Sequence, residues 1–246
     1  IGTKDKQRIV NILTSKDGKM DEHSQSYTFE SSYYQEGEFS SFIPIMNGCN
    51  NFCAYCIVPY VRGREVSRPV DDIIKEFAFL DSKGVKEVTL LGQNVNSYHF
   101  EQDGEIINFP KLLKILAGQK HSVKWIRFES PHPKDFTSEL VQVIKEEKVI
   151  ARHLHIPLQS GSTRILSLMN RKYSQEQFLS LIDEIREAVP EITFSTDVMV
   201  GFPTETEEEY QETLRVLSHM RCLEAFMYYF NPREGTKAVD MEGQVD

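Results

Sequence analysis

Apolar residues along this chain follow two alternating patterns. Short apolar runs, typical of strands, are followed by longer segments in which apolar residues recur every three or four positions, as in helices. The two patterns alternate about six times through most of the chain. The predicted strands are 42–46, 87–91, 125–129, 152–158, 192–200 and 223–230, and the predicted helices are 71–83, 110–117, 138–147, 163–169, one beginning after Ser174 and stopping at Pro190, and one opened by Thr204.

Two of these helices begin with a sequence typical of a capping box, in which a hydroxyl residue is followed three positions later by Glu or Gln. Ser174 precedes Gln177, and Thr204 precedes Glu207. In a capping box the two side chains satisfy backbone N–H groups that the helix leaves free. We therefore expect both helices to begin at these hydroxyl residues.

The repeated strand–helix order predicts an α/β fold with a parallel sheet and crossover helices. Six such units, curled in one direction, form an incomplete TIM-like (β/α)6 barrel, since a complete barrel has eight. A flat, doubly wound sheet is the alternative. Its strands, buried on both faces, would be almost wholly apolar.

Three predicted strands instead have one polar side, which favours the barrel. By the period of two along a strand, the polar sides point one way and the apolar sides the other. A lumen that holds a polar cofactor explains this pattern, and charged residues that pair with each other, such as Arg127 with Glu129, are the alternative explanation. The polar sides are Arg127 and Glu129, His153, His155 and Gln159, and Ser195 and Asp197.

The chain outside the predicted barrel is polar. Residues 1–41 are read as a linker or edge segment, residues 42–232 as the barrel, and residues 233–246 as the start of another linker. No apolar run reaches the length of a membrane span, and the start of the chain lacks the apolar segment of a signal peptide. We expect no membrane segment and a reducing, cytoplasmic location. The net charge of −9 means that any contact with RNA phosphates must be local or come from another domain.

Cys49, Cys53 and Cys56 form a C-x3-C-x2-C loop directly after the first predicted strand. Three thiolates can hold three corners of a metal centre and leave the fourth open. Structural zinc takes four ligands, and no His lies in or just after the loop to complete such a site. Cys222 precedes the last strand and is expected at the opposite end of the barrel. A 4Fe–4S cluster with one open iron is favoured over zinc completed by Cys222 or three unrelated buried cysteines.

Polar residues also follow the other predicted strands, at the rim where parallel barrels carry their chemistry. Three arginines follow the cysteine loop and make a local positive patch, which suits a carboxylate or RNA phosphates. A solvated loop neutralised by Glu65 and nearby acids is the alternative. The rim residues are Gln93, Asn94, Ser130, Gln159, Ser160, Gly201, Phe202 and Pro203, and the arginines are Arg62, Arg64 and Arg68.

The cysteine spacing, with the aromatic Tyr55 before the last cysteine, resembles that of the radical S-adenosylmethionine (SAM) enzymes. Segments 91–98, 130–133, 157–162, 169–171 and 195–203 extend the resemblance to the methylthiotransferase family, over roughly residues 40 to 240. Within that family they look most like members that modify tRNA. Full-length members also have an N-terminal domain with a second cluster and a C-terminal RNA-binding β-barrel, so we interpret this chain as the central domain only.

The resemblance implies a radical mechanism. The cluster on Cys49, Cys53 and Cys56 accepts one electron, from a reductant such as flavodoxin, and cleaves SAM to a 5′-deoxyadenosyl radical. The radical then removes the hydrogen from carbon 2 of an N(6)-isopentenyladenosine beside the tRNA anticodon, where a methylthio group is added. The second 4Fe–4S cluster supplies the sulfur. Alternatives are a threonylcarbamoyl adenosine or ribosomal-protein aspartate substrate, or a cluster-binding module without turnover.

The resemblance also implies roles for individual residues. Tyr55 is expected against the SAM adenine, and Gly92, Gln93 and Asn94 beside the SAM amino group. Contacts to the SAM ribose and carboxylate are expected from Ser130, Gln159, Ser160 and Arg171, and contacts near the adenine from Asp197, Val200, Gly201 and Phe202. Substrate contacts are expected from Arg62, Arg64, Arg68 and His132.

Overall fold

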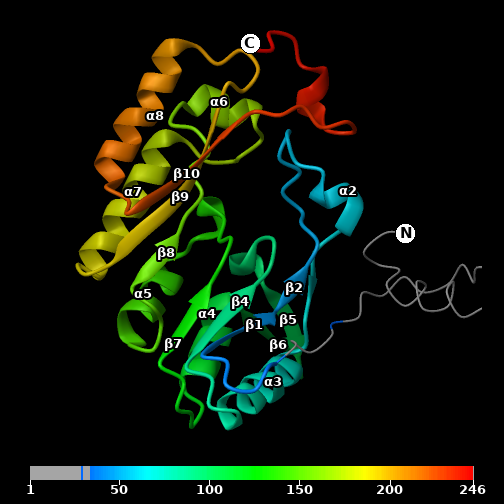
Figure 1. Cartoon of the computed structure of the whole chain (residues 1–246), viewed down its shortest axis with the longest axis vertical. Helices are drawn as coiled ribbons and strands as arrows, with labels where there is room; N and C mark the ends of the chain where they lie inside the picture. The colour runs from blue at the N-terminus through cyan, green and yellow to red at the C-terminus, as the bar shows by residue number, and fades with distance from the viewer. Residues whose placement is uncertain (1–28, 30–33, 246) are drawn as a thin grey trace, which may run out of the picture.

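The computed structural model describes residues 29 and 34–245 (Figure 1). Six parallel strands lie around an arc in the order in which they occur along the chain. A bridge between Ile126 and Ile150 joins the first three strands to the last three. The six strands are β1 (Ser40–Pro44), β4 (Glu87–Leu91), β7 (Trp125–Phe128), β8 (His153–His155), β9 (Thr193–Val200) and β10 (Glu224–Tyr229).

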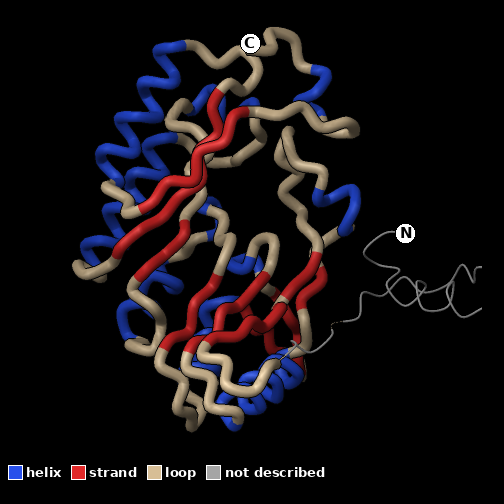
Figure 2. The backbone as a smooth tube through the Cα atoms, in the orientation of Figure 1, coloured by secondary structure: helices blue, strands red, loops and turns tan. Residues whose placement is uncertain are grey.

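This arrangement confirms the incomplete TIM-like barrel. A doubly wound sheet would reverse its strand order at a switch point, whereas here each new strand is added on the same side of the previous one. The outermost strands, β1 and β10, do not pair with each other within the described chain. The arc therefore stays open between them, as Figure 2 shows.

Helices lie on the outer side of the arc because their apolar stripes pack against the strands (Figure 1). In α3, for example, Ile73, Phe77 and Leu80 are at most 1% exposed. The helices are α2 (Val58–Arg62), α3 (Val70–Ser82), α4 (Phe109–Ala117), α5 (Ser138–Glu146), α6 (Thr163–Leu168), α7 (Gln175–Ala188) and α8 (Glu207–Met220), with short 3-10 turns η2 (Val95–Ser97), η3 (Pro133–Asp135) and η4 (Lys237–Asp240).

One of the two predicted capping boxes is confirmed. Ser174 and Gln177 form it at the start of α7. The prediction for α8 was wrong by two residues, because the box is formed by Thr206 and Glu209. Both hydroxyl residues have Glu three positions later, but only Glu209 also accepts hydrogen bonds from Arg164, at 2.6 and 2.8 Å, which fix its position.

Two small antiparallel pairs were not predicted. They are β2 (Met46–Asn47) with β3 (Val66–Ser67), and the hairpin of β5 (His99–Gln102) with β6 (Glu105–Asn108). The turn of the hairpin, Asp103-Gly104, has positive φ at both residues. That conformation matches the twist of a two-residue hairpin.

The polar strand sides pair with each other inside the arc. Arg127 of β7 binds Glu87 of β4 at 2.7 Å, rather than the predicted Glu129. In the parallel register of β4 and β7, Thr89 lies opposite Arg127. Glu87, two positions before Thr89, lies on the same face and is reached diagonally by the long arginine side chain. His155 of β8 bonds to Asp197 of β9 at 3.1 Å. The alternative explanation, internal pairing, therefore accounts for much of this polar face.

The two predicted linkers lie at the edges of the described chain. Most of residues 1–41 fall outside the described residues. Residues 233–245 fold back on the cysteine loop, where the backbone N–H of Ala238 donates to the carbonyl of Ala54 at 2.9 Å. In the part of the chain that the structure describes, no helix combines the length and apolar character needed to cross a membrane.

Candidate cluster and cofactor site

The loop that carries the three cysteines begins with a sharp turn at Gly48. Its φ is 77°, and a Cβ atom here would lie 2.1 Å from the carbonyl oxygen of Arg64, so only glycine fits. The next residue, Cys49, donates its backbone N–H to the carbonyl of Gly63 at 3.1 Å. The start of the loop is thereby fastened to the chain that follows α2.

The far side of the cysteine loop is fastened to the segment after α6. The Asn170 side-chain amide donates to the carbonyls of Asn51 and Phe52, at 3.0 and 2.9 Å. The backbone N–H of Ala54 donates to the carbonyl of Met169 at 2.9 Å. Loop residues 49–56, near β1, are thus held by chain more than a hundred residues away, and their position depends on the closed fold.

The structure places the three cysteines around one cavity of about 190 Å³. The other predicted site residues that line it come from five places in the chain and meet at the rim of the barrel. They are Tyr55, Gln93, Ser130, His132, Gln159 and Arg171. The predicted convergence of the strand ends on one rim is seen for these residues.

The spread of the cysteines suits a cluster better than a single ion. No three His, Cys, Asp or Glu side chains of the described residues are grouped closely enough to hold one metal ion. In a 4Fe–4S cluster each thiolate binds a different iron, so the ligands need not converge on one point. Cys222, which follows α8, packs against the core at the opposite end of the strands. It lies far from the position that would complete a zinc site.

Burial controls the protonation of these thiols. It raises the pKa of Cys49 to about 11, with smaller contributions from Glu65 and the other two cysteines, and it also raises the pKa of Cys56. Both thiols are therefore protonated at neutral pH in the metal-free protein. Iron must displace these protons, since the thiolate is the metal ligand.

A second cavity, of about 570 Å³, adjoins the first and shares Tyr55, Cys56 and Val58 with it. The carboxyl end of β10 provides much of its wall, including Tyr228, Tyr229 and Phe230. The sequence analysis missed this wall. The signal available for it was the aromatic run 228–230, which ends the last predicted strand at the same rim as the other site residues.

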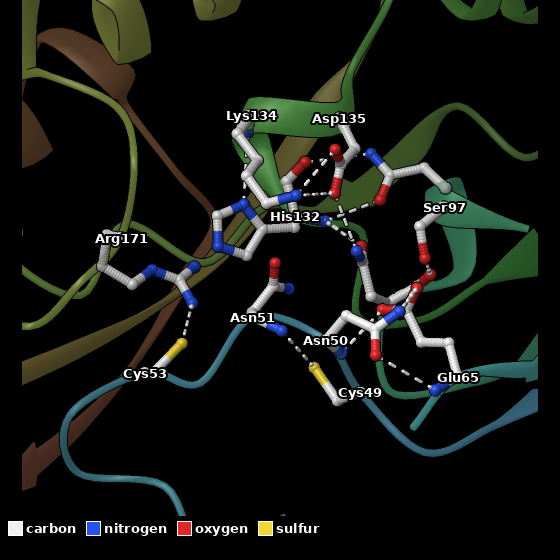
Figure 3. A network of polar contacts seen from close by, with 12 residues as sticks. Cys49, Asn50, Asn51, Cys53, Glu65, Ser97, His132, Lys134, Asp135 and Arg171 are labelled. Atoms are coloured by element: carbon white, nitrogen blue, oxygen red, sulfur yellow. Dashed lines mark hydrogen bonds and ion pairs between the residues drawn. The ribbon is translucent and has the colours of Figure 1, made fainter. Parts of the chain in front are cut away.

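Arg171 lines the smaller cavity and is buried, with 6% of its surface exposed. One terminal nitrogen of its guanidinium donates to Cys53 Sγ at 3.4 Å (Figure 3), and Nε donates to the hydroxyl of Tyr173 at 3.2 Å. Burial by itself would lower the pKa of Arg171, but Tyr173, Tyr55 and Cys53 together raise it well above its ordinary value. The guanidinium is therefore charged at every relevant pH.

His132 presents an unpartnered donor to the same cavity. Its Nδ1 accepts the backbone N–H of Lys134 at 3.2 Å, so the ring proton of the neutral form lies on Nε2. Nε2 is buried and has no hydrogen-bond partner among the residues that the structure describes. Burial, then the charges of Arg171 and Lys134, lowers the pKa of His132 to about 2, which keeps the ring neutral. In Figure 3 the imidazole lies beside the Arg171 guanidinium.

An unpartnered acceptor faces the same space. The Oε1 atom of Gln93 is buried and lacks a hydrogen-bond partner. Buried polar groups without partners are rare in folded proteins and call for an explanation. An acceptor at Gln93, with donors at His132 and Arg171, matches a ligand that carries both an ammonium and a carboxylate group. The amino-acid end of SAM has both.

The remaining predicted cofactor residues lie outside these two cavity walls and support them. Asn94 donates to Asp135 at 2.7 Å, and Ser160 accepts the backbone N–H of Ser162 at 3.2 Å. Phe202 is fully buried and packs in a small cluster with Ala54 of the cysteine loop. The residues that line neither cavity are Gly92, Asn94, Ser160, Asp197, Val200, Gly201 and Phe202.

The three predicted substrate arginines do not form one patch. The prediction that Arg68 contacts the substrate is corrected, because its side chain is 5% exposed and is paired with the buried Glu76. The guanidinium of Arg64 lies over the ring of Phe52, 4.5 Å from its centroid, which stabilises the cysteine loop. Arg62 is half-buried, and its carbonyl accepts from Asn47. None of the three lines either cavity.

One known protein family matches both the barrel and the cysteine loop. Residues 43–217 match the family described as the Radical SAM superfamily. The chain belongs to this superfamily. Its members use a 4Fe–4S cluster and SAM, and the donor set of the cavity described above fits both.

The similar curated proteins are enzymes that modify tRNA. The chain is 48% identical to tRNA-2-methylthio-N(6)-dimethylallyladenosine synthase of Treponema pallidum (strain Nichols), over 97% of this chain and 55% of that protein. It is 51% identical to the synthase of the same name from Phocaeicola vulgatus, over 81% of this chain and 43% of that protein. The chain thus spans about half the length of the curated relatives it matches.

Solved structures support the radical SAM fold. The radical SAM methyltransferase TsrM of Kitasatospora setae, with cobalamin and a [4Fe-4S] cluster bound, matches with a TM-score of 0.65 at 16% identity, over 80% of this chain and 38% of that one. Coproporphyrinogen III oxidase (HemN) of Escherichia coli matches with a TM-score of 0.54 at 17% identity, over 77% of this chain and 43% of that one. At these identities the likeness shows the fold alone.

Proposed function

We propose that this chain is the SAM-cleaving domain of an enzyme that adds a methylthio group to carbon 2 of N(6)-dimethylallyladenosine in tRNA. Identity of 48% over 97% of the chain to a synthase with this activity supports the substrate. One observation carries the chemistry. The same cavity combines three cysteines with a buried donor and a buried acceptor that lack partners.

Each group of this cavity has a role in the proposal. Cys49, Cys53 and Cys56 bind three irons of the cluster and leave the fourth open to SAM. When bound, the cluster and SAM would supply a 5′-deoxyadenosyl radical that can remove a hydrogen atom from carbon 2 of the target adenosine in the tRNA. Gln93 accepts from the ammonium of SAM, and Arg171 and His132 donate to its carboxylate.

The adjoining cavity takes the adenine of SAM and the target base in this proposal. Tyr55 is shared by both cavities and lies at their junction. Its ring, with Tyr228 and Phe230, offers aromatic faces on which bases can stack. Ser130 and Gln159, on the wall of the smaller cavity, are placed to bind the ribose. These groups orient the reactants, while the cofactors supply the difficult chemistry.

The rest of the reaction needs parts beyond this chain. We assign the second 4Fe–4S cluster, as sulfur source, and most of the tRNA contact to the remaining length of the full protein. A one-electron donor such as flavodoxin reduces the cluster, and the enzyme works in the cytoplasm with tRNA. The net charge of −9 agrees with RNA binding by another domain.

The first test needs only this chain. After anaerobic reconstitution with iron and sulfide, the cluster is reduced with dithionite, EPR spectra are recorded on samples frozen with and without SAM, and 5′-deoxyadenosine is measured after incubation with dithionite and SAM. We expect a 4Fe–4S signal that changes with SAM, and release of 5′-deoxyadenosine. A stable cluster that neither responds to SAM nor cleaves it would make the chain a cluster-binding module.

The second test addresses the substrate and uses the full-length protein. It is given tRNA carrying N(6)-dimethylallyladenosine, tRNA carrying threonylcarbamoyl adenosine, or a ribosomal protein with the target aspartate. Mass spectrometry of the products is expected to find the methylthio group only on the first. A product on either of the others would reassign the substrate.

A further inference from the structure

A buried positive charge lies against one cluster ligand. Arg171 donates to Cys53 Sγ at 3.4 Å, and its other guanidinium nitrogens donate to the hydroxyl of Tyr173 and the carbonyl of Pro157, at 3.2 and 3.5 Å. These last two acceptors are neutral. The cysteine is the one partner among them that becomes an anion, because a thiolate is the form that binds iron.

The structure offers Arg171 no carboxylate partner. Among the described residues, no Asp or Glu forms an ion pair with it, although its surface is only 6% exposed. A buried charge without a counter-charge is strongly unfavourable. The other buried cation at this end of the barrel, Arg68, has Glu76 as its partner. For Arg171 the thiolate-ligated cluster is the counter-charge that the geometry supplies.

The position of this charge is fixed independently of any ligand. The hydroxyl of Tyr173 accepts from Nε of Arg171 and also donates to the carbonyl of Leu158 at 2.8 Å. The ring of Tyr173 lies 5.4 Å from the guanidinium carbon. The backbone N–H of Arg171 donates to the carbonyl of Leu166 at 2.9 Å. The guanidinium therefore meets Cys53 without a ligand to hold it there.

We propose that Arg171 is a positioning residue that raises the reduction potential of the cluster through its hydrogen bond to Cys53 and its uncompensated charge. The proposal rests on the cluster of the proposed function, but not on the substrate. Taking up one electron makes the cluster more negative, so a nearby positive charge and an N–H···S bond stabilise the reduced state more than the oxidised one. Net charge and hydrogen bonds to sulfur are known determinants of such potentials.

The test is an EPR-monitored potentiometric titration of the cluster-loaded 246-residue chain without SAM. We expect Arg171→Gln to lower the midpoint by at least 59 mV, which corresponds to a tenfold change in the ratio of reduced to oxidised cluster in a one-electron couple. Arg171→Lys keeps the charge but loses the planar fork, so a smaller decrease is expected. The matched control is Lys172→Gln, which removes one charge from the exposed neighbouring side chain and should leave the midpoint unchanged.

Equal midpoints for the wild type and an Arg171→Gln variant of equal iron content would overturn the proposal. If that variant assembles no cluster, Tyr173→Phe decides, because it keeps both the charge and the cysteines but removes the hydroxyl that holds Nε of Arg171, together with the bonds of that hydroxyl to the carbonyls of Pro157 and Leu158. A small decrease in its midpoint supports the proposal, and an unchanged one contradicts it. If the midpoint of the Arg171→Gln variant falls as expected but the wild-type cluster cleaves no SAM, this inference stands and the proposed function is refuted.

Discussion

Two sets of polar side chains lie inside this barrel, and they differ in whether they have partners. Between neighbouring strands, Arg127 binds Glu87, and His155 bonds to Asp197. At the carboxyl rim, Nε2 of His132 and Oε1 of Gln93 find no hydrogen-bond partner among the described residues, and none of the ion pairs in this part of the chain gives Arg171 a carboxylate. The first set satisfies itself across neighbouring strands. The second set is incomplete without a ligand.

The difference distinguishes these two sets better than their position in the sequence does. It is not confined to the site, because Nε of Arg68 and Oε1 of Glu205 are also buried without a hydrogen-bond partner among the described residues. Residues of the first set lie along strands with a period of two. Those of the second set come after a strand or, for Arg171, after helix α6. A buried group that has its partner contributes to folding, whereas one without a partner lowers stability until a ligand arrives. Functional sites are accordingly places where local satisfaction fails.

The largest expected effect comes from removing a cluster ligand. Cys53→Ala should abolish cluster binding and SAM cleavage, because two thiolates cannot replace three. The matched control is Cys222→Ala, whose side chain packs against the core at the other end of the strands. Iron content and 5′-deoxyadenosine release measure the effect. Loss of iron from the Cys222→Ala protein would overturn the assignment of the ligands.

Next comes the buried pair of Arg68 and Glu76, in which two buried opposite charges face each other. Glu76→Gln leaves Arg68 buried without a counter-charge, so the free energy of unfolding should fall by about 3–5 kcal/mol. Chemical denaturation measures this change. The affinity for SAM, measured in the folded protein, should stay within a factor of about two, since the pair lines neither cavity. A selective loss of SAM affinity with unchanged stability would move Arg68 back into the binding site.

Gln93 represents the unsatisfied class. Gln93→Leu removes the acceptor for the SAM ammonium and should weaken SAM binding by about 1.5–3 kcal/mol, the value of a hydrogen bond to a charged group. Calorimetry on the cluster-loaded chain measures the affinity. Stability without SAM should be equal or higher, because a buried acceptor without a partner is removed. A stability loss with unchanged affinity would show that Gln93 is structural.

His132 gives a smaller effect that depends on pH. In the folded protein its pKa is lowered to about 2, by burial first and then by Arg171 and Lys134. In the unfolded protein this histidine takes up a proton below about pH 6.5. Lowering the pH from 7 to 5 therefore stabilises the unfolded state by about 2 kcal/mol. This contribution is lost in His132→Gln, whose stability should therefore fall less over that range.

Denaturation curves of both proteins at pH 5 and 7 test this expectation. Other titrating groups are present in both proteins and cancel in the comparison. One of them is His155, where burial works against protonation but the bond to Asp197 raises the pKa above its ordinary value. Equal pH dependence in the two proteins would show that the His132 ring is accessible to protons in the folded state.

The sequence by itself determined the elements and the cluster loop. Apolar periodicity located the six barrel strands and the helices that cover them to within a few residues, because burial of one face imposes its spacing on the chain. It did not find α2 or the small antiparallel pairs. The spacing of Cys49, Cys53 and Cys56 is local, and so could be read without a structure. The capping box of α8 was misplaced because Thr204 and Thr206 offer the same local pattern, and only the contact of Glu209 with Arg164 distinguishes them.

Only the tertiary structure decided which polar residues have partners. Arg68 and Arg171 are both candidate site arginines in the sequence, but in the structure one lies against Glu76 and the other against Cys53. His132 and His155 both accompany strands, yet the parallel register gives only His155 an acid across the sheet. Satisfaction of a buried charge depends on residues that are distant in sequence and adjacent in space. No local pattern along the chain contains that information.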